Sequence, residues 1–176
     1  MIIGITGTLG AGKGMVAEYL TKKHNFTYYS VRNFFAQEVL RRGKMVNRDT
    51  IAEVAAQLRT KHGPTYALEQ LMKQVLAGKH VVIESIRTKE EAEFLKSKGA
   101  LVWAIDADMQ VRYQRTLQRD ASVEHVSFES FTEKEKADTS LKEVVALADT
   151  LLRNDGTKEA LFGDVEVALA KSGLSA

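Results

Sequence analysis

The chain reads Gly-Thr-Leu-Gly-Ala-Gly-Lys over residues 7–13, between a short apolar run at 2–6 and a helical pattern that starts near Met15. Glycines let the backbone turn tightly and point successive N–H groups inward, which makes a concave site for anions. The helix that follows adds free N–H groups and the positive end of its dipole. Lys13 adds a mobile positive charge for the β- and γ-phosphates. Gly-x4-Gly-Lys between a strand and a helix therefore predicts a loop that binds nucleotide phosphates.

The two positions after the lysine depart from the general pattern of such loops. A Ser or Thr usually follows the lysine and holds Mg2+ through its hydroxyl. Here Gly14 and Met15 stand in its place, so Mg2+ would be held by carboxylates, waters and the nucleotide itself. We expect Mg2+ and ATP as cofactors, with ATP contacted by Gly7, Leu9, Gly10, Ala11, Gly12, Lys13, Gly14 and Met15.

Composition sets the broad class of the protein. At 176 residues the chain is long enough for one domain with a buried core. A net charge of +2 neither favours nor excludes nucleic acid, and the absence of cysteine excludes disulfides and thiol nucleophiles. No apolar run approaches the roughly 20 residues of a membrane span, and the N-terminal run is too short for a signal peptide. We expect a single cytoplasmic domain over residues 1–176.

Short apolar runs alternate with helical patterns along the whole chain, which predicts an α/β fold with a parallel sheet. Runs that are apolar on both faces, such as 81–83, suit strands covered by helices on each side. The expected fold is therefore a three-layer α/β/α arrangement around a five-stranded parallel sheet. The strands are expected at 2–6, 26–29, 81–84, 101–105 and 150–153.

Several helix boundaries carry recognisable signals. The run 62–64 predicts a helix that ends with Gly63 as its C-cap, and a next helix with Pro64 in its first position. The polar, weakly patterned stretch at 120–139 predicts a mobile lid, although it has no arginine between 120 and 138. A Ser or Thr followed three residues later by Glu predicts a capping box. This pattern occurs at Thr50 with Glu53, Thr88 with Glu91, and Ser140 with Glu143.

Polar residues follow the strand at 81–84, at the edge where open parallel sheets bind ligands. Glu84 ends this strand and would hold Mg2+ through water or orient phosphates. Arg87 comes three residues later, and its planar guanidinium suits the clamping of phosphate oxygens. The alternative for Arg87 is an ion pair with Glu90 or Glu91 on the helix that follows.

A second group of polar residues follows the strand at 26–29. Ser30 and Arg32 lie at the start of the next helix, where both could face a bound ligand. Ser30 is also a good N-cap, which would explain it without a ligand. The alternative interpretation of Arg32 is a solvated arginine in the first turn of this helix.

Three arginines follow the strand at 101–105. Asp108 is expected to cap a helix on which Arg112, Arg115 and Arg119 share one face. Three cations on one face repel each other unless they meet anions, so this helix could present them to a phosphoryl group in transfer. The alternative is a set of salt bridges to the carboxylates of Glu124, Glu133 and Glu135.

Gly-Lys-Gly at 12–14, the acidic strand end followed by an arginine, and the arginines before the lid resemble the adenylate kinase group of nucleoside monophosphate kinases. The resemblance follows the whole chain in element order and is tight at the loop, at 84–87 and at 108–119. It implies transfer of the γ-phosphoryl group of ATP to a small-molecule nucleotide, a ribo- or deoxyribonucleoside monophosphate. We expect a monomer or weak homodimer without nucleic acid or membrane partners.

This resemblance also implies roles for the polar residues around the sheet. The turn at 154–157 would contact the adenine edge, with a plain turn capped by Thr157 as the alternative. The implied catalytic residues are Lys13, Glu84, Arg115 and Arg119, with Arg119 in the best matching position. The acceptor residues are Ser30, Arg32 and Arg87, the metal residue is Glu84, and the adenine contacts are Asn154 and Gly156.

Two other functions remain open from the sequence. Dephospho-coenzyme A kinases, which phosphorylate a ribose hydroxyl, resemble the chain at 4–7 and in Asp106-x-Asp108. They usually carry an acidic residue after the second strand, where this chain has Arg32, and this difference favours a phosphate acceptor. The second alternative is an ATP-binding regulatory module with slow hydrolysis, favoured by the missing hydroxyl after Lys13 and the arginine-poor lid.

Overall fold

The computed structural model describes residues 1–119, 127–137 and 139–174. Its centre is a parallel sheet of five strands in the order β2-β3-β1-β4-β5, so the expected α/β/α fold class is confirmed. Each strand lies within one residue of its predicted bounds. The strands are β1 (Ile2–Gly7), β2 (Thr27–Ser30), β3 (Val81–Glu84), β4 (Leu101–Asp106) and β5 (Thr150–Arg153).

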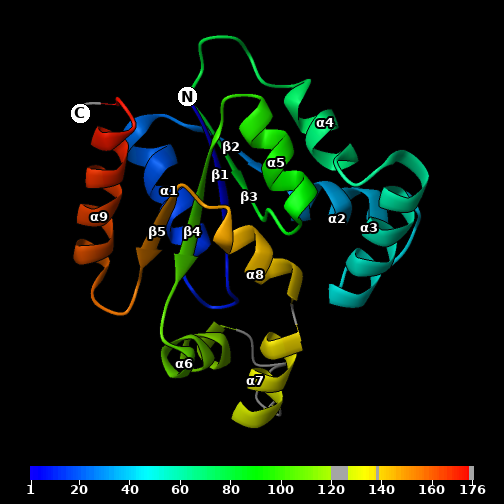
Figure 1. The fold of residues 1–176 in the computed structure, drawn as a ribbon. Coiled ribbons are helices and arrows are strands. Elements are labelled where there is room, and N and C mark those ends of the chain that lie inside the picture. The colour runs from blue at the N-terminus through cyan, green and yellow to red at the C-terminus, as the bar shows by residue number, and fades with distance from the viewer. Residues whose placement is uncertain (120–126, 138, 175–176) are drawn as a thin grey trace.

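Helices cover both faces of the sheet (Figure 1). On one face α1 and α9 pack over Ile5, Trp103 and Ile105, which are fully buried. On the other face α5 and α8 lie over the sheet, and α2, α3 and α4 form a group to one side. The helices are α1 (Lys13–His24), α2 (Val31–Arg41), α3 (Arg48–His62), α4 (Tyr66–Met72), α5 (Lys89–Ser97), α6 (Met109–Arg119), α7 (Phe128–Ala137), α8 (Thr139–Ala146) and α9 (Lys158–Lys171).

Strand register brings the segments that follow the strands to one edge of the sheet. Ile5 of β1 is paired with Glu84 of β3, and Ser30 of β2 is paired with the same glutamate. On the other side of β1, Gly7 is paired with Ile105, the residue before the end of β4. Because all strands run in one direction, the glycine loop and the polar residues after the other strands share this edge.

Some of the predicted helix boundaries are confirmed. Thr88 and Glu91 form the expected capping box of α5. Gly63 is the C-cap of α3 with a φ of 101°, a left-handed conformation that favours glycine. The hydroxyl groups of Ser30 and Thr157 accept the expected N-cap hydrogen bonds at α2 and α9.

Asp108 accepts from the N–H of Gln110 at 2.8 Å and so caps α6 as expected, whereas three other predicted boundaries are wrong. Thr50 is not the N-cap of α3, because Asn47 caps that helix and Thr50 occupies its third position and completes the capping box. Ser140 lies inside α8 instead of before it. Pro64 precedes Thr65, the N-cap of α4, and so does not occupy the first helical position. Asparagine is as strong an N-cap as serine, and the prediction overlooked it.

The predicted lid contains a helix in its described part. Residues 120–126 and 138 lie outside the described residues, whereas 128–137 form α7. The ring of Tyr113 on α6 lies 5.3 Å from that of Phe128 and 5.6 Å from that of Phe131, so α7 packs on α6. None of the helices in the described part of the chain is long and apolar enough to cross a membrane.

Candidate functional site

The glycine loop is shaped by three left-handed residues that press against neighbouring elements. Gly7, Gly10 and Gly12 have φ values of 138°, 79° and 101°. A Cβ on Gly7 would lie 2.0 Å from the carbonyl oxygen of Ile105, and one on Gly10 would lie 2.5 Å from that of Arg112. Any side chain at these positions would therefore displace the loop from β4 or from α6.

Lys13 lies over this loop. Its Nζ donates hydrogen bonds to the carbonyl oxygens of Gly7 at 2.9 Å and Thr8 at 2.8 Å. The helix α1 begins at Lys13 with Gly12 as N-cap, with no capping side chain and no acidic residue in its first turn. The positive end of the helix dipole and the lysine charge therefore meet at the loop, in the arrangement that suits phosphate.

The residues after Lys13 have plain structural roles. Gly14 is exposed, and a Cβ there would meet nothing within 4 Å. Met15 is partly buried and packs against the core between the sheet, α1 and α9. Neither position brings a hydroxyl to the loop, as expected from the sequence.

Asn154 supports the loop from beneath. Its side chain is 3% exposed, and its Nδ2 donates to the carbonyl oxygen of Ala11 at 2.7 Å. A Cβ on Gly12 would lie 2.3 Å from this nitrogen. Gly156 lies two residues further on in an exposed turn. The contact of this turn with adenine stays a prediction, whereas the support of the loop by Asn154 was missed.

Asp106, at the end of β4, connects the loop to β5. One carboxylate oxygen accepts from the hydroxyl of Thr8 at 2.8 Å, and the other accepts from Nη1 of Arg153 at 2.8 Å. The sequence placed Asp106 after a strand but assigned it no partner. Threonine inside a glycine loop, facing an acidic strand end, was the signal that could have found this contact.

The three arginines of α6 have different surroundings. Arg112 is 3% exposed; its Nε donates to the Ala107 carbonyl at 2.7 Å, and its guanidinium forms a two-pronged ion pair with Glu135 of α7. The salt-bridge alternative therefore holds for Arg112. Arg115 donates from Nη1 to the carbonyl oxygen of Asn154 at 2.9 Å, directly beside the loop. Arg119 ends α6, and its side chain lies outside the described part of the structure.

Glu84 and the start of α2 form a second polar group at the same edge. The hydroxyl of Tyr28 donates to Oε2 of Glu84 at 2.6 Å. Burial, followed by the hydrogen bond to Glu84, raises the pKa of Tyr28 to about 12, while the charge of Arg32 opposes this shift. Ser30 is buried and accepts from the N–H of Asn33, and Arg32 is exposed.

Arg87 belongs to a tightly held turn after β3. Its backbone N–H donates at 2.8 Å to Oε2 of Glu91, a fully buried carboxylate. The other oxygen of Glu91 accepts from Nη2 of Arg59 on α3 at 2.7 Å. Ser85 has a φ of 71°, which is unusual for a residue other than glycine. The side chain of Arg87 itself is exposed.

A Mg2+ site would need ligands from the bound nucleotide as well as from the protein. No group of three or more His, Cys, Asp or Glu side chains that could hold a metal occurs among the described residues. Among the same residues, Tyr28 is the one hydrogen-bond partner of the Glu84 side chain, and it uses one of the two carboxylate oxygens. One carboxylate, completed by phosphates and waters, is a common way to hold Mg2+, so the residues fit this ion.

Comparison with known proteins shows the family to which the chain belongs. A family model described as an AAA domain matches residues 3–139. A UPF0200 protein of Pyrococcus abyssi is 31% identical over 97% of this chain and 96% of its own length. The chain belongs to the UPF0200 family of AAA-domain proteins. A UPF0200 protein of Pyrobaculum aerophilum is 32% identical over 88% of this chain and 84% of its own.

Solved structures similar to this UPF0200 chain include shikimate kinases. That from Bacteroides thetaiotaomicron has a TM-score of 0.67 at 15% identity and covers 99% of both chains. That from Aquifex aeolicus has a TM-score of 0.66 at 19% identity over the full length of both. At these identities the likeness shows the fold alone, which is the fold of small P-loop kinases. The resemblance to nucleoside monophosphate kinases in particular stays a prediction.

Proposed function

We propose that this UPF0200 chain is an ATP-dependent phosphotransferase that moves the γ-phosphoryl group of ATP to a ribo- or deoxyribonucleoside monophosphate. The main support for the proposal is the glycine loop. The Lys13 ammonium group and the first turn of α1, which has no capping side chain, both lie at this loop. The loop N–H groups and Lys13 would hold the β- and γ-phosphates of the donor. Arg115, which is bonded to the carbonyl of Asn154 beside the loop, would act on the same phosphates.

The acceptor side of the proposal rests on Arg32 and Arg87. Both are exposed, and both follow strands that pair at Ser30 and Glu84. A nucleoside monophosphate brings its own anionic nucleophile, so it needs guanidinium groups to position it and no general base. Two arginines at the same edge of the sheet as the phosphate loop fit this requirement.

Mg2+ would supply neutralisation of charge between the donor phosphates when it is bound. Glu84 is the residue proposed to hold it, through water. The Tyr28 hydroxyl donates a hydrogen bond to Oε2 of Glu84 and so can orient this carboxylate. The other carboxylate oxygen would then accept from a water on Mg2+.

A hydroxyl acceptor is the second candidate. Glu84 could accept the proton of a hydroxyl group, as transfer to a ribose in dephospho-coenzyme A would require. The shikimate kinases that share the fold are named for an acceptor that is not a nucleotide. Both acceptors therefore belong in the experiment that tests the proposal.

The test is a coupled assay of ADP release with ATP, Mg2+ and one acceptor at a time. The panel contains the ribo- and deoxyribonucleoside monophosphates, dephospho-coenzyme A and shikimate, and each reaction is repeated with Lys13→Ala. We expect turnover with a nucleoside monophosphate that is lost in the variant. Turnover with dephospho-coenzyme A or shikimate instead would establish a hydroxyl acceptor. Binding of ATP without transfer to any member would favour a regulatory module.

A further inference from the structure

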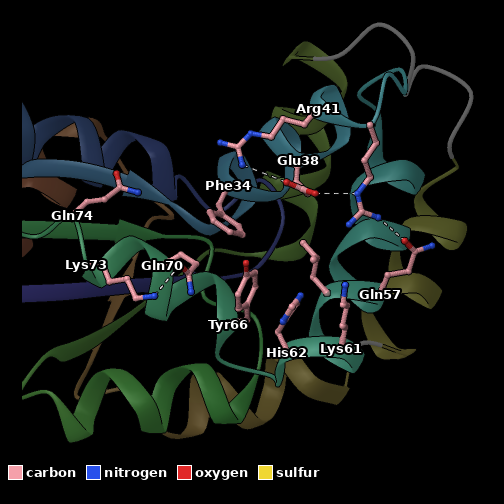
Figure 2. Close-up of a pocket in the computed structure, with 12 residues that line it drawn as sticks. Phe34, Glu38, Arg41, Gln57, Lys61, His62, Tyr66, Gln70, Lys73 and Gln74 are labelled. Carbon is pink, nitrogen blue, oxygen red and sulfur yellow. Dashed lines mark hydrogen bonds and ion pairs between the residues drawn. The ribbon is translucent and has the colours of Figure 1, made fainter.

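The helices α2, α3 and α4 enclose a pocket of about 730 Å³ (Figure 2). At one end of the pocket, the Tyr29 hydroxyl of β2 donates a hydrogen bond to the carbonyl oxygen of Gln74 at 3.0 Å. Pockets of this size hold small organic ligands. The lining residues are Phe34, Glu38, Arg41 and Arg42 of α2 and its C-terminal end, Gln57, Leu58, Lys61 and His62 of α3, and Tyr66, Gln70, Lys73 and Gln74 of α4 and the turn after it.

This pocket lies on a different side of α2 from the proposed acceptor site. Arg32 and Phe34 are two residues apart, which separates their side chains by about 200° around a helix. Phe34 lines the pocket, whereas Arg32 is exposed and does not line it. A ligand in the pocket would therefore not occupy the place proposed for the nucleoside monophosphate.

The pocket has an excess of positive charge. Four cationic side chains line it against the single carboxylate of Glu38. Glu38 already pairs with Arg42 at 3.1 Å and with Arg41 at 3.4 Å, so one negative charge is shared by two guanidinium groups. Lys61 makes no hydrogen bond or ion pair within the described part of the chain, and Lys73 reaches the uncharged side chain of Gln70 at 3.1 Å. An anion is the ligand that would relieve this repulsion.

One wall of the pocket is aromatic. The rings of His62 and Tyr66 stack with centroids 4.4 Å apart and planes at 21°. Phe34 meets Tyr66 edge-on, with centroids 6.0 Å apart. Figure 2 shows Tyr66 and His62 side by side with Lys61 next to them. A flat ring can stack on such a surface while charged groups of the same ligand reach the lysines.

We propose that the pocket between α2, α3 and α4 is a second ligand site, which binds a nucleoside polyphosphate outside the phosphate loop. The cations take the phosphate groups, and the aromatic wall takes the base. The amide side chain of Gln74 supplies a donor and an acceptor that a base can use. This site does not depend on which acceptor the phosphate loop serves.

Isothermal titration calorimetry with ADP as the probe, without Mg2+, tests this proposal. Four proteins are compared: the unmodified chain, Lys13→Ala, a Lys61→Glu/Lys73→Glu double variant, and Lys171→Glu. Lys61 and Lys73 are exposed, so the reversals should leave the fold intact, and circular dichroism checks this. Lys171, exposed on α9 at the other face of the sheet, controls for a charge reversal away from the pocket.

We expect Lys13→Ala to keep a binding event that the double variant weakens by about tenfold or more, because each lost charged hydrogen bond is worth about 1.5 kcal/mol or more. Lys171→Glu should bind as the unmodified chain does. Inorganic pyrophosphate, added in place of ADP, should bind the pocket more weakly because it lacks a ring. Equal ADP binding by the double variant and Lys171→Glu would overturn the site, and equal affinity for pyrophosphate and ADP would overturn the role of the aromatic wall.

Discussion

Lys13 is the residue on which the proposed chemistry depends most. Its ammonium group lies over the glycine loop and is held by two carbonyl oxygens of that loop. These bonds keep the charge where donor phosphates would lie. The lysine supports no other element through them, so its removal should affect ligands more than folding.

Lys13→Ala should reduce turnover by at least about 10³-fold, because a preorganised charge at the transferring phosphoryl group is lost. The rate is measured with the acceptor that the panel identifies. Lys22→Ala is the control, since Lys22 lies on the same helix, is exposed and pairs with its neighbour Glu18. Normal turnover in Lys13→Ala would contradict the proposed function.

Arg87→Ala should raise the KM of the acceptor about tenfold or more and leave the KM of ATP nearly unchanged. The reason is that Arg87 is proposed to contact the acceptor phosphate alone. Steady-state kinetics with each substrate varied in turn measures both constants. Lys89→Ala, an exposed neighbour that pairs with Glu93, is the matched control. Equal effects on the two substrates would argue against the clamp.

At the scale of elements, the turn after β3 is joined to α3 by the buried carboxylate of Glu91. This carboxylate accepts from the backbone of Arg87 and from Arg59, and Thr6 of β1 donates to the carbonyl of Ile86 in the same turn. The group of helices that holds the second pocket is thereby connected to the proposed acceptor site.

Glu91→Gln should lower the free energy of unfolding by about 1.5–3 kcal/mol, because the buried side chain at this position loses its charged hydrogen bonds with Arg59 and with the backbone of Arg87. Glu90→Gln, one position away on the exposed side, should change it by less than about 0.5 kcal/mol. Urea unfolding followed by circular dichroism gives both values. Similar stabilities of the two variants would show that the Arg59 pair contributes little.

Glu166 connects α9 to α1 and predicts a pH dependence. Hydrogen bonds from Lys23, Tyr19 and His24, in that order of effect, lower the pKa of Glu166 from 4.5 to about 2. The stabilisation is complete above pH 4.5, where the carboxylate is ionised in both folded and unfolded chains, and is lost as the pH falls toward 2. Melting temperatures of Glu166→Gln should therefore be lower than those of the unmodified chain at pH 6 and converge with them near pH 2. A constant difference would contradict this.

At the scale of the whole molecule, the glycine loop is held by elements from distant parts of the chain. Asp106 and Arg112 reach it from β4 and α6, and Asn154 reaches it from the turn that follows β5. Arg112 also carries the ion pair to Glu135, so the described part of the predicted lid is attached to the helix that supports the loop.

Glu135→Gln should loosen α7 without unfolding the sheet. The change removes the carboxylate that compensates Arg112, a buried cation. Hydrogen exchange followed by mass spectrometry should show exchange of α7 amides at least about tenfold faster, with β1 and β4 unchanged. Lys136→Gln, exposed on the same helix, serves as control. Unchanged protection of α7 in Glu135→Gln would mean that its packing on Tyr113 suffices.

Local pattern was enough for the elements of the sheet and for the phosphate loop. The five strands are short apolar runs bounded by turns, and the loop needs glycines at three left-handed positions, which no other residue adopts as easily. The cap of α5 was predictable because its two partners are three residues apart. The cap of α3 was missed because Asn47 and Thr50 compete for that position within the same short stretch.

What the sequence alone determined is therefore the α/β fold and the placing of Lys13, Glu84 and Arg87 at one edge of the sheet, since both follow from local pattern and parallel strands. Only the tertiary structure decided the partners across the chain: Asn154 under Ala11, Arg112 with Glu135, and the pocket between three helices. The physical reason is distance along the chain. A carboxylate in the sequence has many possible cations, and packing selects among them.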